Sequence, residues 1–155
     1  MWRSLKKEAA IAVKAYKNYD TPVLLSLLSI LYWAEGTKYD KGGVVFTNTD
    51  PRLAYLFLDL LRKTCDIDES RLRVRLHLHY YHKKGETVKF WSDLLKVPVD
   101  QFHGTYVKKR SANKRFRKNF IVICFIKYGD TQTRRKILSY AYALQEHLAP
   151  VAQLD

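Results

Sequence analysis

Leu-Ser-Ile-Leu-Tyr-Trp-Ala-Glu-Gly occupies residues 28–36 and carries a hydrophobic segment directly into an acid and a glycine. A helix end carries partial negative charge from its unpaired carbonyl groups, so a carboxylate there is repelled by its own helix. Two readings of Glu35 are open. In one, Gly36 takes the left-handed conformation that ends many helices, and Glu35 points into water. In the other, the carboxylate lies where a divalent cation binds, which reverses the repulsion.

The residues before this segment predict a helix and a boundary. Asp20-Thr21-Pro22 is a typical helix start, with proline in the first turn, and predicts a helix from Thr21 to Glu35. Residues 2–18 combine apolar and basic residues at helical spacing. The sequence therefore predicts a basic N-terminal helix or connector over residues 1–20, a folded domain over 21–148 and a tail over 149–155.

The rest of the domain alternates strands and helices. Strands are expected at 44–47, 71–81, 105–109 and 120–128, and helices at 50–63, 86–95 and 131–147. Asp50 and Thr131 are the expected caps of two of these helices, and a basic hairpin loop is expected to join the last two strands. This order predicts an α+β domain with a mostly antiparallel, curved four-stranded sheet that has helices on one face and an open second face.

Charge is concentrated in one third of the chain. The 155 residues carry a net charge of +13, with 47% hydrophobic and 14% aromatic residues, enough for one well-filled core. Residues 71–118 alone hold 14 lysines and arginines against three acids, a net +11. Such a field favours a polyanion, and nucleic acid is the commonest one inside a cell.

The strand expected at 71–81 alternates cationic or titratable residues with aliphatic ones, which places the two kinds on opposite faces. Arginines two residues apart on one face repel each other unless an anion compensates, and arginine can donate two hydrogen bonds to a guanine edge. The pattern predicts a DNA-reading surface, with a strand exposed to water as the alternative. The candidates are Arg71, Arg73, Arg75, His77 and His79.

A denser basic run follows the third strand and predicts phosphate contacts, with a charged loop in water as the alternative. Contacts of this kind position a protein on a duplex, and their binding energy falls as the salt concentration rises. The residues of this run are Lys108, Lys109, Arg110, Lys114, Arg115, Arg117 and Lys118.

Other chemistries are not expected. His77, His79 and His82 lack a cysteine or carboxylate at ligand spacing, so they do not predict a zinc site. Cys65 and Cys124 have no metal or redox spacing and are expected to be reduced thiols, with Cys124 buried in a strand. No segment is long and apolar enough to cross a bilayer, which needs about 20 residues. We therefore expect a cytoplasmic protein that has access to DNA and no membrane partner.

Five positions of the opening segment match the signature helix of the LAGLIDADG homing endonucleases, which this segment resembles. They are the first, fourth, seventh, eighth and ninth positions, here Leu28, Leu31, Ala34, Glu35 and Gly36. The order of elements between residues 22 and 147 is compatible with that family. Two positions depart from the pattern: the third, usually small, is Ile30, and the sixth, often acidic, is Trp33.

The resemblance implies how an active site is assembled. In that family the motif helix packs against a second copy of itself, and the acid at the eighth position holds a catalytic metal at the foot of the helix. By resemblance, Glu35 with Gly36 is the expected Mg²⁺ site. Lys127, placed by its position at the end of the last strand, is the expected catalytic counterpart of the basic residue that the family keeps near the cleavage centre. A single motif implies a homodimer, with the interface formed by Ser26, Ile30, Trp33 and Ala34.

The sequence thus leads to one functional hypothesis and two alternatives. The hypothesis is a homodimeric LAGLIDADG-like endonuclease that binds double-stranded DNA specifically and cleaves it in a Mg²⁺-dependent reaction. One alternative is a regulator that binds DNA on the same fold without cleaving it. The other is an RNA-binding or splicing-assistance protein whose Tyr80 and Tyr81 stack unpaired bases.

Overall fold

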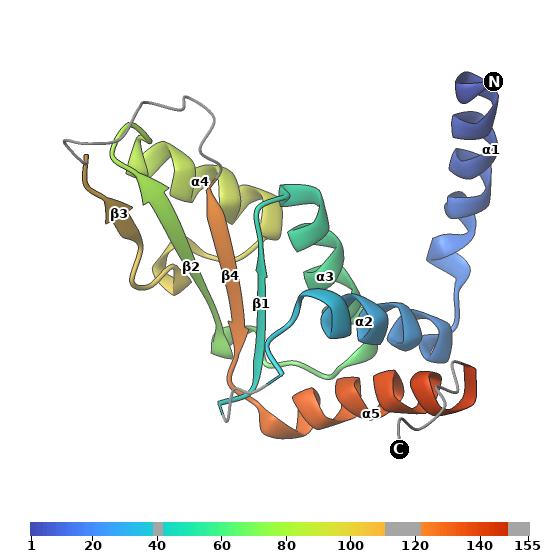
Figure 1. Cartoon of the computed structure of the whole chain (residues 1–155). Coiled ribbons are helices and arrows are strands. Elements are labelled where there is room, and N and C mark those ends of the chain that lie inside the picture. The colour runs from blue at the N-terminus through green and yellow to red at the C-terminus, as the bar shows by residue number, and fades with distance from the viewer. Residues whose placement is uncertain (39–41, 111–121, 149–155) are drawn as a thin grey trace, which may run out of the picture.

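A computed structural model describes residues 1–38, 42–110 and 122–148, and these residues form the α+β domain that the sequence predicts (Figure 1). The helices are α1 (Trp2–Lys14), α2 (Thr21–Glu35), α3 (Pro51–Thr64), α4 (Lys84–Leu95) and α5 (Thr131–Leu148). The strands are β1 (Val44–Asn48), β2 (Leu72–His79), β3 (Tyr106–Lys108) and β4 (Ile123–Tyr128). Short 3-10 helices are η1 (Ala15–Asn18), η2 (Glu69–Arg71) and η3 (Val99–Gln101).

The four strands form one sheet in the order β1-β4-β2-β3. β4 is antiparallel to both of its neighbours, whereas β2 and β3 run parallel, so the sheet is mixed. The predicted hairpin between the last two strands is wrong, because β3 pairs with β2 at one edge and β4 inserts between β1 and β2. The physical reason is the α4 crossover, which returns the chain to the start of β2 and makes the next strand parallel.

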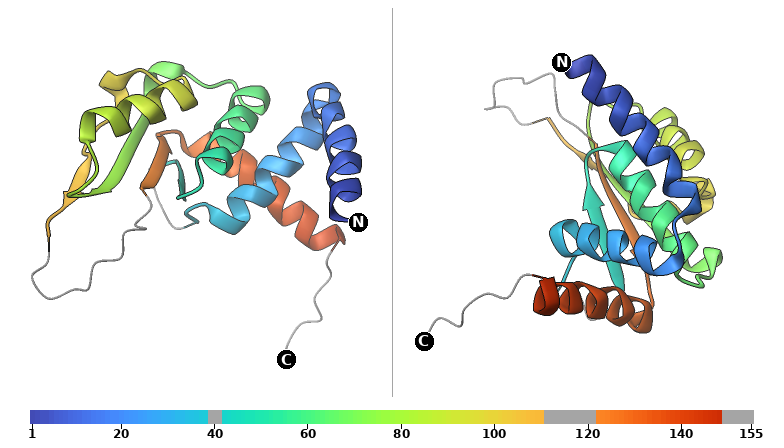
Figure 2. Two further views of the ribbon diagram at one scale, coloured as in Figure 1. Left: turned by 90° about the horizontal axis from the view of Figure 1, so that it is seen from above. Right: turned by 90° about the vertical axis from the view of Figure 1, so that its right-hand side faces the viewer.

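Helices α3 and α4 lie on one face of the sheet (Figure 2). In the described ranges no helix covers the second face, called the open face below, as the sequence predicts. β2 shows why: Leu72, Val74, Leu76 and Leu78 are buried under the helices, and the residues between them are at least partly exposed. The strict alternation of the sequence therefore becomes the division between core and surface.

Three stacked rings join the motif helix to the sheet. The ring centroid of Phe57 in α3 lies 4.1 Å from that of Phe46 in β1. It lies 6.3 Å from that of Tyr32 in α2. None of the three rings is exposed to solvent. Buried aromatic rings of this size contribute strongly to core stability, so this stack fixes α2 against the β1 edge.

Side-chain caps start three of the described α-helices, α2, α3 and α5. Asp20 accepts a hydrogen bond from the Val23 amide at 3.2 Å, and Asp50 accepts one from the Arg52 amide at 2.8 Å, which confirms both expected starts. The expected cap by Thr131 is wrong. Asp130 caps α5 by accepting from the Thr133 amide at 2.7 Å, because α5 begins at Thr131 and the capping residue is the one that precedes the first helical residue.

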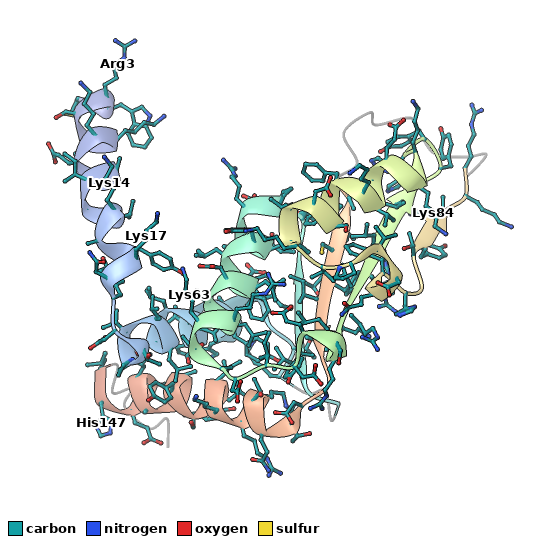
Figure 3. All side chains as sticks on the ribbon, turned by 180° about the vertical axis from the view of Figure 1, so that it is seen from behind. Arg3, Lys14, Lys17, Lys63, Lys84 and His147 are labelled. Carbon is teal, nitrogen blue, oxygen red and sulfur yellow. The ribbon has the colours of Figure 1, made fainter. Side chains whose placement is uncertain are left out.

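The N-terminal helix α1 projects from the body of the molecule and buries none of its residues (Figure 1). Figure 3 labels Arg3, Lys14 and Lys17 along this projecting arm, seen from behind. The arm is fastened at its base, where the Tyr16 hydroxyl donates to Asp59 at 2.9 Å and Lys63 pairs with the same carboxylate at 2.7 Å. Burial, and then the bond to Asp59, raise the pKa of Tyr16.

Both cysteines are free and buried, as expected for Cys124 in its strand. Burial raises the pKa of the Cys124 thiol to about 12, so the thiol stays protonated. Across the part of the chain that the structure describes, no helix combines the length and the apolar character needed to cross a membrane.

Candidate nucleic-acid interface

The carboxylate of Glu35 is exposed at the C-terminal end of α2. It makes no hydrogen bond or ion pair with any described residue. The left-handed conformation expected of Gly36 in one of the two readings is wrong, because its φ is −87° and its ψ is 160°. The glycine is needed for a different reason: a Cβ at this position would lie 2.3 Å from the Tyr32 ring. A tight contact, and not backbone handedness, therefore selects the glycine after Glu35.

Tyr32 also fixes the chain that leaves α2. Its hydroxyl donates to the Thr37 carbonyl at 2.6 Å, and the Val45 amide donates to the same hydroxyl at 3.4 Å. The Thr37 amide in turn donates to the Val45 carbonyl at 2.9 Å, and Gly36 forms a β-bridge with Phe46. These bonds hold the end of α2, and with it Glu35, beside the β1 edge of the sheet.

The open face collects most of the predicted DNA-reading residues. Arg73, Arg75, His77 and His79 lie on it, as the alternation predicts. Arg71 does not belong to the strand; it lies in η2, one residue before β2 begins. The strand register places Lys127 opposite Arg73 and Lys108 opposite His79, so cations from three strands share this face.

Three cations surround a pocket of about 430 Å³ at one end of the open face. Arg71, Arg73 and Lys127 line it with Gly42, Val44, Val45, Tyr128 and Gly129, and we call it the cationic pocket. Arg73 donates to the carbonyls of Ser70 at 2.6 Å and Leu72 at 2.7 Å, and Arg71 donates to the Gly129 carbonyl. These bonds orient both guanidinium groups. Arg71 also forms an ion pair with Asp130 at 4.0 Å.

A row of rings crosses the same face, and the sequence analysis missed it. His77 lies with its ring centroid 4.6 Å from Phe125 and 5.5 Å from Tyr106, and Arg75 lies 4.7 Å over the Phe125 ring. We call Phe125, His77 and Tyr106 the aromatic row. Burial, and then the charge of Arg75, lower the pKa of His77. The alternation of residues 123–128 indicates which side chains of this strand share a face. Only the strand register shows which rings of neighbouring strands meet.

The other predicted residues are not all brought together. Lys108 lies at the end of β3, and Lys109 and Arg110 follow it as exposed residues. The loop cations Lys114, Arg115, Arg117 and Lys118 lie outside the described residues. Glu35 and Lys127 are not joined by a hydrogen bond or ion pair in the described ranges, although Lys127 pairs in register with Val45, next to the chain that leaves α2.

His79 and His82 are joined by a hydrogen bond across the turn that follows β2. The Nδ1 atom of His82 accepts a hydrogen bond from the His79 amide at 2.9 Å, which occupies a potential ligand atom. Within the described ranges, no three His, Cys, Asp or Glu residues gather closely enough to hold a metal ion. Tyr80 and Tyr81 lie in the turn after β2, partly exposed, with Tyr81 stacked on His79 at 5.5 Å.

One side of α2 is apolar and exposed. Ile30, Trp33 and Ala34 of the predicted interface lie there, while Ser26 is half-buried and donates to the Pro22 carbonyl at 2.9 Å. Val23 and Leu27 extend the surface along the helix, so we define the α2 stripe as Val23, Leu27, Ile30, Trp33 and Ala34.

The chain matches no known protein family, no curated protein and no solved structure. The structure defines the fold class: an α+β domain with helices on one face of a mixed four-stranded sheet.

Proposed function

We propose that this chain is a homodimeric, LAGLIDADG-like endonuclease that binds double-stranded DNA on its open face and cleaves it in a Mg²⁺-dependent reaction. The observation that carries the proposal is the exposed carboxylate of Glu35, which pairs with none of the described residues and is held by Tyr32 beside the β1 edge of a sheet whose open face is basic. Among the described residues no cation pairs with this acid, and the C-terminus of its own helix repels it.

The basic face supports DNA as the ligand. None of the described residues on the open face is acidic, and Arg73, Arg75, Lys108 and Lys127 all lie on it. Neutralising phosphates with such cations releases counterions and supplies much of the binding energy for duplex DNA. Arg71 and Arg73, already oriented by carbonyl groups, would hold phosphate oxygens without losing further side-chain freedom.

The donors for Mg²⁺ fit a shared site better than a site within one chain. Glu35 supplies one carboxylate, and the described residues offer no cluster of three ligands. Mg²⁺ is commonly bound by one or two carboxylates with phosphate oxygens and water. Glu35 from each of two copies would supply two carboxylate ligands. When bound, Mg²⁺ supplies activation of water and stabilisation of the leaving oxygen. Lys127 would place its ammonium group against a phosphate in the cationic pocket.

The α2 stripe supports the homodimer. Ile30 is 51% exposed and Trp33 is 37% exposed, beside a carboxylate that needs a second copy. Ile30 stands where the family has a small residue, so the two α2 helices would lie further apart than small residues allow.

A DNA-binding regulator without cleavage is the second candidate. The observation that favours it is that, within the described residues, Glu35 belongs to no group of three His, Cys, Asp or Glu side chains that could hold a cation. The regulator retains the open face and the α2 stripe and leaves Glu35 without a catalytic role.

Cleavage is tested with a library of duplex DNA, Mg²⁺ and the variant Glu35→Gln. We expect cleavage by the natural chain and none by the variant, while both bind the same duplexes in Ca²⁺. Cleavage by Glu35→Gln at the natural rate would remove Glu35 from the mechanism, and binding without cleavage by the natural chain would favour the regulator.

The dimer is tested by sedimentation of Leu27→Asp, with Leu56→Asp as the matched control. Leu27 on α2 is 40% exposed and Leu56 on α3 is 38% exposed, so both substitutions add a charge at a similarly exposed leucine. Only Leu27→Asp is expected to give a monomer. Equal dissociation constants for the two variants would place the dimer contact away from the α2 stripe.

A further inference from the structure

The aromatic row is not explained by phosphate binding. Its three rings come from three strands, and the register holds them on one surface, with His77 between Phe125 and Tyr106. Tyr106 is 55% exposed, at the edge of the sheet, while His77 and Phe125 are half-buried. Covering the exposed ring of Tyr106 and the exposed parts of the other two rings with a ligand would remove apolar area from water.

The chemistry of the row matches the faces of nucleobases. In a duplex these faces are stacked inside the helix, so rings meet them only where a strand is unpaired. We propose that the aromatic row is a stacking platform for the unpaired bases of a single nucleic-acid strand, whose phosphates lie on the cations around it. The proposal rests on the proposed function only in taking nucleic acid as the ligand, and it needs neither Glu35 nor cleavage.

Charge complementarity selects this occupant. Arg75 lies over the Phe125 ring, and Lys108 follows Tyr106 two residues along β3 on the same face. An arginine plane beside rings adds a further stacking surface. The absence of acids among the described residues of this face excludes a basic partner and favours a polyanion. DNA and RNA strands share the required chemistry, so both are tested.

The test compares single strands that differ only in their bases. Labelled DNA and RNA strands of about 12 nucleotides are titrated in metal-free buffer, alongside a blunt duplex and a strand of equal length with abasic residues at its centre. The abasic strand keeps every phosphate. The natural chain is expected to bind the intact strand about 5- to 100-fold more tightly than the abasic strand, since stacking acts base by base. The strand that binds more tightly, DNA or RNA, identifies which nucleic acid the aromatic row prefers.

The variant Tyr106→Leu is expected to remove most of this difference and to leave duplex affinity within about twofold. Phe90→Leu is the matched control, because Phe90 is 54% exposed but lies on α4, under the opposite face. Equal binding of intact and abasic strands by the natural chain would overturn the proposal. An equal loss of single-strand and duplex affinity in Tyr106→Leu would overturn it as well. Failure of cleavage with the base-dependent preference intact would refute the endonuclease alone.

Discussion

Replacement of Gly36 by alanine tests how the end of α2 is built. The Cβ of Gly36→Ala would lie 2.3 Å from Cδ2 and 2.4 Å from Cε2 of Tyr32, and 2.5 Å from the Tyr32 carbonyl oxygen. Carbon atoms in contact prefer about 3.5–4.0 Å. The ring cannot yield easily, because Tyr32 is fully buried and its hydroxyl is bonded on two sides.

The expected cost follows from this overlap. The backbone at Gly36 is already extended, so alanine suffers no penalty of handedness, and the loss comes from overpacking alone. Overpacking of this kind costs about 1–3 kcal/mol. With a urea slope of about 2 kcal/mol per molar, the unfolding midpoint is expected to fall by about 0.5–1.5 M. Circular dichroism in urea measures this midpoint directly.

Gly85→Ala is the control for that measurement. Gly85 lies in α4, and nothing lies within 4 Å of a Cβ built on it. Alanine there is expected to raise stability by about 0.4–1 kcal/mol, because it restricts the unfolded chain without a clash. Midpoints that change alike in the two variants would refute the role of Tyr32 in selecting the glycine.

Three further outcomes follow from individual residues. Asp130→Ala removes the α5 cap and is expected to cost about 1 kcal/mol in urea unfolding. Its bonds to Thr133 lower the pKa of Asp130, so this contribution is present above about pH 4 and disappears as the pH falls through the lowered folded value. Burial, and then the charge of Arg75, lower the pKa of His77. The free energy of unfolding is therefore expected to decline as the pH falls below about 6.5, where the histidine of the unfolded chain takes up a proton before that of the folded chain. His77→Gln is expected to reduce this decline, measured as the urea midpoint at each pH. Buried Cys124 is expected to resist alkylation at pH 8 until urea unfolds the chain, as mass spectrometry would show.

Local patterns predicted the elements well, because each depends on neighbours in sequence. The alternation along β2 fixed which of its side chains are buried, and the caps at Asp20 and Asp50 were visible as an acid beside a helix start. The cap of α5 was assigned one residue late. Asp130 and Thr131 are adjacent, and both residue types can cap a helix, so only the geometry separates them.

The topology could not be predicted in the same way. β3 is only three residues long and has no buried residue, so nothing in its sequence specifies the partner strand. For the same reason the sequence could not join Phe125 to His77, which are far apart in the chain and meet only through the register of β4 on β2. The acid at the exposed end of α2 could be predicted from the sequence because it belongs to one continuous segment. The aromatic row and the cationic pocket needed the order of the strands.

The central position of β4 has a consequence for how the chain is made. β1 and β2 both hydrogen-bond to a strand that the ribosome makes after both of them, with α3, α4 and β3 already synthesised. Until that strand arrives, β1 and β2 each expose an unpaired backbone edge to the other, and such edges invite pairing with other chains. The nascent protein therefore has a gap in the middle of its sheet until β4 is made, and that gap can be filled by β4 or by an exposed strand of another chain.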